Sequence, residues 1–344
     1  MERHLIPETQ AAAPPPGRPT LKTIAFMTGL GVTTVSRALK DAPEIGEETR
    51  RRVKLVAAQV GYRPNRAGVR LRTGKTNVIS LVVNTEERVG GFVSDIIYGI
   101  AEVLAPTPYH LIVTPYFSQD DPLAPVRYVV ETGSADGVII SRTEPDDRRV
   151  RFMAARGFPF ATHGRTATAI EHAFHDFDNT GFARDAVRRL ALLGRRRLAL
   201  LGPPSKLSYA MHTRDGFSEA LAEAGLSESS FRSVTIDDSM ETIRDAARAL
   251  MARVPRPDGV VSSGGSATLA LVAGIEDAGL VVGRDVDVVS KQSTPILKLF
   301  RPAILTVDED FRLAGRELAR AVLSAIEGTP VSKLQSLHMP SPPT

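Results

Sequence analysis

The chain contains 344 residues, of which 42% are hydrophobic and 24% are charged, and it has no cysteine. The lack of cysteine excludes a disulfide framework, thiolate catalysis and a cysteine-based zinc site. The length predicts two or three folded units, and without an apolar run of about 18 residues no membrane span is expected.

The net charge of +4 is distributed unevenly along the chain. Residues 18–75 carry 13 lysines and arginines against 4 acidic residues, which gives a net charge of +9. Residues 1–17 carry −1 and residues 76–344 carry −4. A short basic segment beside a large acidic remainder is typical of a protein whose basic part contacts a polyanion. From charge alone, a solvated basic face with no partner is the alternative.

The N-terminal residues 1–19 are rich in proline and alanine and predict a disordered arm. They contain no apolar stretch of the kind that a secretory signal peptide needs. The expected location of the protein is therefore cytoplasmic.

Three short helices are expected in residues 20–63. The first spans about Leu21–Thr28, with Thr20 as its N-cap. The sequence TGLG then permits a tight turn, and two more helices are expected over about Val32–Leu39 and Glu47–Val60. Two helices joined by a glycine-containing turn and closed by a third are typical of a helix-turn-helix DNA-binding domain.

The second of these helices carries short polar side chains in the sequence TTVSRAL. A helix in the major groove contacts base edges with its N-terminal residues. The hydroxyls of Thr33, Thr34 and Ser36 can donate to phosphates or bases. Arg37 can bind guanine with two hydrogen bonds or hold a phosphate. An ordinary three-helix domain with an exposed polar face is the alternative.

Residues 64–76 predict a linker with a hinge helix. Pro64 ends the preceding element, and Asn65 can cap a new one. Two helical turns starting at Arg66 and ending at Arg72 fit the pattern, but a helix this short is marginal alone. Its folding is therefore expected to be coupled to the binding of DNA or a partner, and Asn65 and Arg66 join the predicted DNA-binding residues.

The strings IAFMTGLGVTTVSRALKD and TRRRVKLVAAQVGYRPNRAGVRLRTGKT resemble the DNA-binding head of the LacI-type transcriptional regulators. The resemblance implies DNA contacts at three residues of the second helix: Val32, Thr33 and Arg37. It also implies that Leu71 wedges into the minor groove and kinks the DNA. Two residues depart from the family pattern: Gly31 replaces the usual Ser or Thr cap, and Gly68 replaces the usual hinge alanine.

Residues 77–340 alternate short apolar runs with helical patterns, which predicts parallel sheets covered on both faces and divided between two lobes. A small ligand is expected in the cleft at the carboxyl ends of the strands. The expected strands are VISLVV, HLIVTP, DGVII, FPFAT, RLALLG, SVTI, DGVVS, DVDVV and AILTV. The expected helices lie near residues 93–105, 121–132, 146–156, 180–193, 209–224, 240–253, 266–278 and 311–327.

Motifs that would indicate an enzyme are missing. The chain has no GxGxxG after a first strand, no GxxxxGK[ST], no GxSxG and no HExxH. The sequence SSGGS (262–266) can bind an anion through backbone amides, but this motif alone is a weak indication of a site. HDFDN (175–179) can suggest an acidic pair or a metal site, but a strand end with an N-cap at Asp178 or Asn179 is the favoured interpretation. No catalytic residue, cofactor or metal is predicted.

The strings FHDFDNTGFARDAVRRLALLGRRRLALLGPP and ILTVDEDFRLAGRELARAVLSAIEG resemble the sensor domain of the same family, which is similar to periplasmic sugar-binding proteins. The resemblance implies a small effector, usually a sugar. Several pocket positions depart from the family: Thr213 replaces an arginine, with Arg214 displaced by one; Gly264–Gly265 replaces Asn-Asp; and Gln292 replaces an Asp. PFATHGR and PDDRRV are similar to a branch associated with α-glucoside uptake.

Sugar sites combine planar polar groups with aromatic faces, and seven residues of these types fall at predicted strand ends or helix starts. A structural role is the alternative for each. The predicted ligand-binding residues are Phe92, Asp147, His163, Tyr209, Arg214, Lys291 and Gln292.

Together these features predict a homodimeric repressor that binds palindromic operator DNA and is controlled by a small effector, a carbohydrate, with no membrane contact. Its expected architecture is an all-α helix-turn-helix head followed by an α/β sensor, similar to periplasmic binding proteins, with two parallel-sheet lobes. A solute-binding protein is one alternative. A regulator of the same fold that activates, or that uses a non-sugar corepressor, is another.

Overall fold

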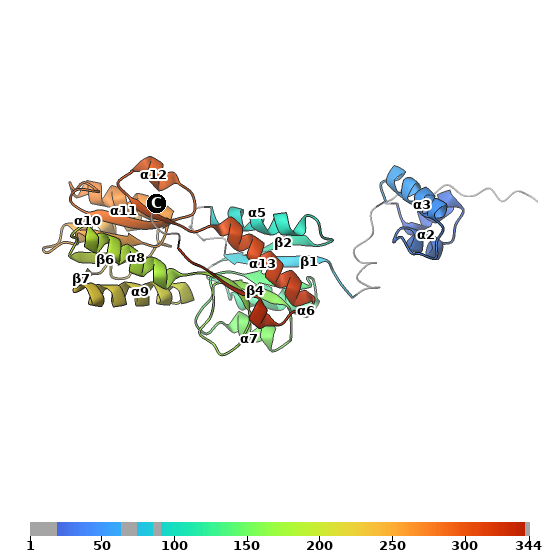
Figure 1. Ribbon diagram of the computed structural model, residues 1–344, viewed down its shortest axis with the longest axis horizontal. Coiled ribbons are helices and arrows are strands. Elements are labelled where there is room, and N and C mark those ends of the chain that lie inside the picture. Colours follow the sequence, from blue (N-terminus) through green and yellow to red (C-terminus); the bar gives the residue numbers. More distant parts are fainter. Residues whose placement is uncertain (1–18, 63–73, 85–90, 118, 341–344) are drawn as a thin grey trace, which may run out of the picture. The chain divides into compact units, whose positions relative to one another are not determined.

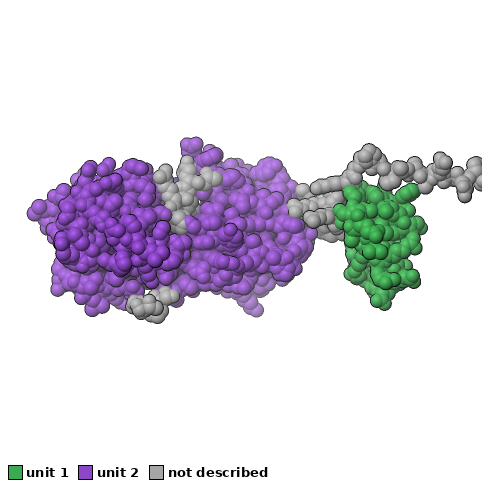
Figure 2. Space-filling view, turned by 90° about the horizontal axis from the view of Figure 1, so that it is seen from above, with its two compact units in different colours: residues 1–76 green, residues 77–344 purple. Residues whose placement is uncertain are grey.

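The computed structural model describes residues 19–62, 74–84, 91–117 and 119–340. The chain divides into two compact units, residues 1–76 and 77–344 (Figure 2). Among the described residues, no helix has the length and apolar character that crossing a membrane requires.

The N-terminal unit is a bundle of three helices. They are α1 (Leu21–Thr28), α2 (Val32–Ala38) and α3 (Glu47–Gln59). Thr20 caps α1, because its side chain accepts a hydrogen bond from the Thr23 amide while the Thr23 hydroxyl accepts one from the Thr20 amide. Gly29 ends α1 with φ at 67°, a left-handed conformation that glycine adopts without strain. One apolar cluster joins the three helices: Ile24, Ala25, Val35, Ala38, Val53 and Ala57.

The second unit contains two sheets in which every strand pairing is parallel (Figure 1). The first sheet has the order β11-β5-β4-β3-β1-β2 and the second has the order β10-β9-β8-β6-β7. The strands are β1 (Val78–Asn84), β2 (His110–Tyr116), β3 (Gly137–Ile140), β4 (Phe160–His163), β5 (Ala173–Phe177), β6 (Arg197–Leu201), β7 (Ser227–Ser229), β8 (Gly259–Ser262), β9 (Asp287–Gln292), β10 (Leu305–Asp308) and β11 (Gln335–His338).

Helices cover both faces of each sheet. In the first lobe, α5 and α13 pack on one face and α6 and α7 on the other. In the second lobe, α10 and α11 cover one face and α8 and α9 the other. The helices are α5 (Phe92–Leu104), α6 (Leu123–Thr132), α7 (Arg148–Ala154), α8 (Asn179–Leu192), α9 (Ser208–Ala224), α10 (Met240–Met251), α11 (Gly265–Asp277), α12 (Ile296–Phe300) and α13 (Phe311–Ile326), with a 3₁₀ turn at Val331–Lys333.

Strand β1 shows why the sequence adopts this layered arrangement. All seven of its residues, VISLVVN, are buried, as expected for a parallel strand covered on both faces. Ile79 and Leu81 point toward α5 and α13, whereas Val78 and Val82 point toward α6 and α7. The predicted fold class, a helical head with a sensor of two parallel-sheet lobes, is therefore confirmed.

Some sequence-based element predictions were wrong. The stretch SVTI (233–236) is a loop, in which the amide and the hydroxyl of Thr235 both donate to the Asp238 carboxylate. The edge strand that pairs with β6 is instead the short polar β7. Strand β11 and helix α12 were also not predicted. Strand β5 was missing from the expected strands, but the strand end expected before an N-cap at Asp178 is confirmed, since β5 ends at Phe177 and Asp178 caps α8. Strands β7 and β11 are short and mostly polar, so they lack the apolar run that predicts a strand.

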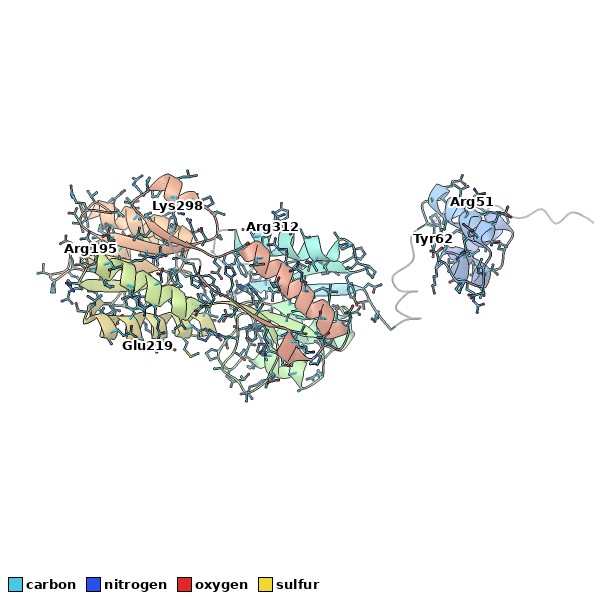
Figure 3. The ribbon with its side chains drawn as sticks, in the orientation of Figure 1. Arg51, Tyr62, Arg195, Glu219, Lys298 and Arg312 are labelled. Atoms are coloured by element: carbon cyan, nitrogen blue, oxygen red, sulfur yellow. The ribbon has the colours of Figure 1, made fainter. Side chains whose placement is uncertain are left out.

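The chain passes between the lobes after β5, at Asp178, and again after β10, at Glu309 and Asp310. The second passage leads into α13, which returns to the first lobe and lies along α5 (Figure 1). Glu102 of α5 pairs with Arg312 at the exposed edge of this helix pair (Figure 3). Both passages lie at the carboxyl ends of strands, so they border the space between the lobes.

The crossing of α5 and α13 depends on two glycines. A Cβ atom on Gly99 would lie 2.1 Å from the carbonyl oxygen of Arg312, and one on Gly315 would lie 2.4 Å from that of Ile96. We therefore expect Gly99→Ala to separate the two helices and destabilise the protein by about 1–3 kcal/mol, measured by chemical unfolding. Ala101→Val, at an exposed position of the same helix, is the control. Equal stability of the two variants would contradict the close-packing argument.

Candidate functional site

Helix α2 presents the predicted DNA-reading residues in the pattern that a docking helix needs. Val35 and Ala38 are buried in the bundle core. Val32, Thr33 and Arg37 are exposed on the opposite side. Thr34 and Ser36 are half-buried at its edges. The N-cap Gly31 contributes no capping side chain, so the amides of the first turn of α2 are left without a side-chain acceptor.

Exposed basic side chains occur on α2 and α3. Arg37 lies 3.5 Å from Glu44, but both side chains are more than half exposed, so the pair holds Arg37 only weakly. Arg51 of α3 is exposed (Figure 3), whereas Arg52 of the same helix donates to the Thr28 carbonyl at 2.5 Å. The N-terminal unit therefore offers exposed positive side chains together with a short polar helix face. Asn65, Arg66 and Leu71 lie outside the described residues, and their roles stay predictions.

The second candidate site is a cavity between the two lobes, with about 520 Å³ of space that includes some open solvent. Four of the seven predicted ligand-binding residues line it: Phe92, His163, Tyr209 and Lys291. The residues that sequence reasoning missed are Arg142, Thr143, Gly164, Asp176, Asn179, Ile236, Ser263, Glu309 and Phe311.

Lys291, near the end of β9, is a buried residue that lines this cavity. Its Nζ atom lies 2.7 Å from a Glu309 carboxylate oxygen and donates to the Asn179 side-chain oxygen at 2.8 Å. Nζ also lies 5.1 Å from the ring centre of Phe177 and 5.6 Å from that of Tyr209, distances at which aromatic faces attract a cation. Glu309 and Asn179 belong to the two passages between the lobes, so Lys291 ties both passages to the second sheet.

Aromatic rings form the other wall of the cavity. Phe92 packs edge-on against Phe311, with ring centres 4.9 Å apart, and lies 5.3 Å from the His163 ring. Burial, together with the positive charge of Lys291, lowers the pKa of His163 to about 4. His163 is therefore a neutral ring at pH 7, able to stack and to exchange one hydrogen bond with a ligand.

Asp176, at the end of β5, is a buried carboxyl beside the cavity. Its pKa is raised to about 6, chiefly because burial disfavours the charged form, while the nearby Arg165 acts in the opposite direction. Arg165 Nε lies 2.9 Å from the Asp176 carboxylate, and His212 Nδ1 lies 4.0 Å from it. The carboxyl can accept hydrogen bonds from ligand hydroxyls.

Charges around the cavity occur in opposite pairs. Arg142, on the first lobe, lies 2.5 Å from Asp237 on the second. The other pairs are Lys291 with Glu309 and Arg165 with Asp176. Three cations therefore face three carboxylates, an arrangement that suits a neutral polar ligand better than a charged one. Among the described residues, no group of three or more His, Asp or Glu side chains is placed to hold a metal ion.

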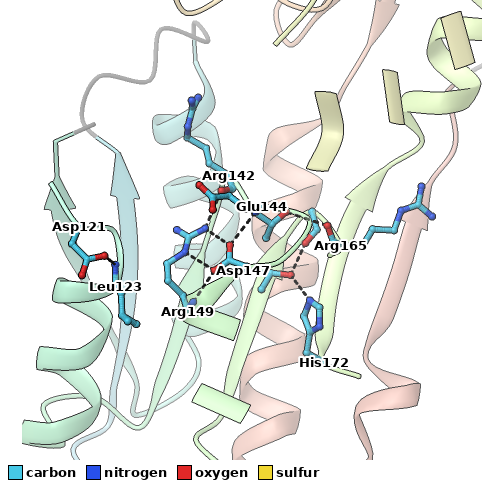
Figure 4. A network of polar contacts seen from close by, with 11 residues as sticks. Asp121, Leu123, Arg142, Glu144, Asp147, Arg149, Arg165 and His172 are labelled. Atoms are coloured by element: carbon cyan, nitrogen blue, oxygen red, sulfur yellow. Dashed lines mark hydrogen bonds and ion pairs between the residues drawn. The ribbon is translucent and has the colours of Figure 1, made fainter. Parts of the chain in front are cut away.

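Two predicted ligand residues lie elsewhere. Asp147 caps α7, and its carboxylate is held by the Arg149 guanidinium at 2.7 Å and by the Glu144 amide at 3.1 Å (Figure 4). Burial acts to raise the pKa of Asp147, but Arg149 and the amides of Glu144 and Arg149 outweigh it and hold the pKa below its usual value. Arg214 lies on the outer side of α9, paired with Glu228 at 2.5 Å. These contacts are structural, and neither residue lines the cavity.

Gln292 lies in a second cavity that adjoins the first one and has about 720 Å³ of space, part of it open solvent. Ser263, Lys291, Glu309 and Phe311 line both cavities. Three of the missed residues share one sequence signal. Asp176 and Asn179 in FHDFDN, and Glu309 in LTVDED, are polar residues at or just after a parallel strand, where ligand sites form.

Two regions of the chain match known protein families. Residues 20–65 match the bacterial regulatory proteins of the lacI family, and residues 187–342 match a periplasmic binding protein-like domain. The HTH-type transcriptional regulator AglR from Rhizobium meliloti (strain 1021) is 34% identical over 318 residues, which cover 89% of this chain and 87% of the relative.

Solved structures agree with this relationship. The complex of the transcriptional regulator CelR with cellobiose has a TM-score of 0.66 and 25% identity, covering 94% of this chain and 98% of that one. The lac repressor dimer bound to operator and an anti-inducer has a TM-score of 0.84 over 95% of this chain and 98% of that one. At 20% identity, the second similarity concerns the fold alone.

Removal of the buried ammonium provides a test of the site. Lys291→Met is expected to lower the free energy of unfolding by about 3–5 kcal/mol, because it leaves the Glu309 carboxylate buried and unpaired. The double variant with Glu309→Gln is expected to recover much of this loss. Chemical unfolding of both proteins measures the effect, and equal losses in both would contradict a coupled ion pair.

A second test concerns pH. Burial, together with the neighbouring imidazole of His163, which disfavours a second charge beside it, lowers the pKa of His175 to about 4. Its unfolded value is about 6.5, so the unfolded chain binds more protons between these two pH values and the folded state loses stability as the pH falls through them. As the pH falls through this range, the His175→Gln variant is expected to lose less folding stability than the unmodified protein, by up to about 1.4 kcal/mol per pH unit. Thermal melting from pH 7 to pH 4 measures this, and parallel profiles for the two proteins would contradict it.

Proposed function

The chain belongs to the lacI family of bacterial regulatory proteins, and we propose that it is a transcriptional repressor whose binding to operator DNA is controlled by a sugar. The relatives AglR and CelR are transcriptional regulators. Among the described residues of the cavity, no catalytic constellation occurs. The observation that carries the proposal is the combination of a basic helix-turn-helix unit with a neutral, aromatic-walled cavity in one chain.

The DNA-binding part of the proposal rests on α2. Its exposed residues Val32, Thr33 and Arg37 contact bases, and the half-buried hydroxyls of Thr34 and Ser36 contact phosphates. The excess of lysine and arginine in residues 18–75 supplies affinity that falls as salt rises. Asn65, Arg66 and Leu71 extend the contact through the hinge, and a homodimer presents two heads to a palindromic operator.

The effector part rests on the cavity. Aromatic faces on Phe92, Phe311 and Tyr209 suit the apolar faces of a pyranose ring, and paired charges leave polar groups for its hydroxyls. A relative of this fold binds cellobiose in a solved complex. We favour an α-glucoside, because the similarity of PFATHGR to a branch associated with α-glucoside uptake includes His163, which lines the cavity.

Control of DNA binding follows from the position of Lys291. Lys291 is bonded to Asn179 on one passage between the lobes and to Glu309 on the other. A sugar that contacts this group of three residues therefore favours one lobe arrangement over another. A ligand shifts such an equilibrium only through its different affinity for the two states, and coupling of this kind is typically about 1–3 kcal/mol. In the proposed mechanism, the change in lobe arrangement separates the hinge segments (residues 64–76) of the two subunits and so weakens operator binding.

Fluorescence-anisotropy titration against the DNA upstream of the protein's own gene, with and without a panel of sugars at fixed salt, tests the proposal. Tight binding that one sugar releases is the expected result. Tighter binding in the presence of the sugar would contradict induction and indicate a corepressor. Specific binding that no sugar changes would contradict the effector class, and the absence of specific binding would contradict the DNA-binding role.

Within the DNA-binding unit, Arg37→Ala is expected to weaken binding to the specific site by about 1–3 kcal/mol and to affect a scrambled site much less. Arg51→Ala on α3, which removes the same charge, is the control and is expected to weaken both sites by similar small amounts. Anisotropy titrations with the two DNAs measure the ratio. An unchanged ratio in Arg37→Ala would contradict base reading by Arg37.

A further inference from the structure

The motif PDDRRV (145–150) spans the end of the loop after β3 and the start of α7. Neither Asp147 nor Arg149 lines the first or the second cavity, so the proposed function gives them no role. Their side chains are nevertheless only 2% and 3% exposed. A buried ion pair is by itself weak evidence of added stability, and the contacts of this pair point instead to a role in fixing the loop.

Asp147 and Arg149 are joined by a bidentate contact. The two carboxylate oxygens of Asp147 accept from Nε and Nη2 of Arg149, at 3.0 and 2.7 Å. The amides of Glu144 and Arg149 donate to the same carboxylate at 3.1 and 2.8 Å. Nη2 of Arg149 also donates to the carbonyl oxygen of Arg142 at 2.9 Å (Figure 4). Asp147 therefore orients the guanidinium, and the guanidinium holds the backbone of Arg142.

Arg142 needs such support because its backbone is left-handed, with φ at 54°. This conformation is uncommon for a residue other than glycine, and it persists only where surrounding contacts enforce it. The hydrogen bond from Arg149 to the Arg142 carbonyl is one contact of this kind. In this conformation the Arg142 side chain, which is 9% exposed, reaches the second lobe and lies 2.5 Å from Asp237.

The next residue of the loop, Thr143, makes another contact with the second lobe. Its carbonyl oxygen accepts a hydrogen bond from the amide of Ser208 at 2.8 Å. Ser208 is the first residue of α9, and the first amides of a helix have no partner within the helix. The first lobe therefore supplies the acceptor for this amide, and two consecutive residues of one loop bridge the lobes.

We propose that the loop after β3 is a latch that holds the two lobes together, and that Asp147 and Arg149 are its positioning residues. They fix Arg142 in the left-handed conformation from which its guanidinium reaches Asp237. The two passages of the chain link the lobes covalently. The latch consists of non-covalent contacts, so it can open while those links remain intact.

The latch lies where a ligand can act on it, since Arg142 and Thr143 both line the first cavity. A ligand that hydrogen-bonds to the Arg142 guanidinium competes with Asp237, and it thereby changes the free-energy difference between lobe arrangements. This step rests on the proposed function, because it connects the latch to operator binding. The latch itself depends only on contacts within the sensor.

Hydrogen exchange of the full-length protein tests the latch, because the Ser208 amide donates from one lobe to the other. Arg142→Gln and Asp237→Asn each remove one side of the ion pair, and both are expected to speed exchange at Ser208 by about tenfold or more. Electron-transfer fragmentation of the exchanged peptides assigns the effect to this amide. Amides further along the same helix, such as those of Ala220 and Leu221, are expected to keep their exchange rates.

A double variant tests the positioning role. Asp147→Ser with Arg149→Met leaves no unpaired member of this ion pair buried and retains a residue that can cap α7. It is expected to speed exchange at Ser208 as much as Asp237→Asn does, and the addition of Asp237→Asn to it is expected to change nothing further. Arg148→Met is the matched control, because it removes an exposed arginine from the neighbouring position of α7, and it is expected to leave exchange at Ser208 unchanged.

Unchanged exchange at Ser208 in Arg142→Gln and Asp237→Asn would overturn the latch. Equal acceleration along the whole of α9 would also overturn it, because that result indicates loss of the helix. An effect of Asp237→Asn that persists in full in the double variant would overturn the positioning role of Asp147 and Arg149.

The operator affinity of the same variants, measured by fluorescence anisotropy, separates this inference from the proposed function. A changed affinity in the variants that open the latch is the expected result. Faster exchange at Ser208 with unchanged operator affinity would leave the latch standing and would contradict control of DNA binding by the lobe arrangement.

Discussion

The arrangement of the sensor depends on a single buried cation. The ammonium group of Lys291 is taken out of water at the end of β9, which is tolerable only if partners surround it. These partners come from distant parts of the chain: Asn179 begins α8, Glu309 follows β10, and Phe177 ends β5. Because Asn179 and Glu309 lie on the two passages between the lobes, the requirement to pair one charge fixes the hinge of the sensor.

The contacts of Lys291 with Asn179 and Glu309 also suggest how ligand binding can change the lobe arrangement. A buried pair contributes little net stability compared with apolar residues of similar volume, but removal of either partner is costly. A ligand that competes for Glu309 or Asn179 therefore changes the balance between lobe arrangements more than its own contact area suggests. Arg142, which lines the cavity, and Asp237 form a second ion pair that joins the lobes.

The general architecture follows from the sequence because it is encoded in local patterns. Apolar runs such as VISLVV are long enough to indicate buried parallel strands, and capping residues mark helix starts, as Asp178 does for α8. The polar β7 and β11 carry no such pattern; they are strands because neighbouring strands offer them unpaired edges. The candidate site was predictable only in part for the same reason. His163 and Lys291 end strands that the sequence indicates, whereas Asp147 is drawn away from the cavity by Arg149, a contact between side chains that spacing does not predict.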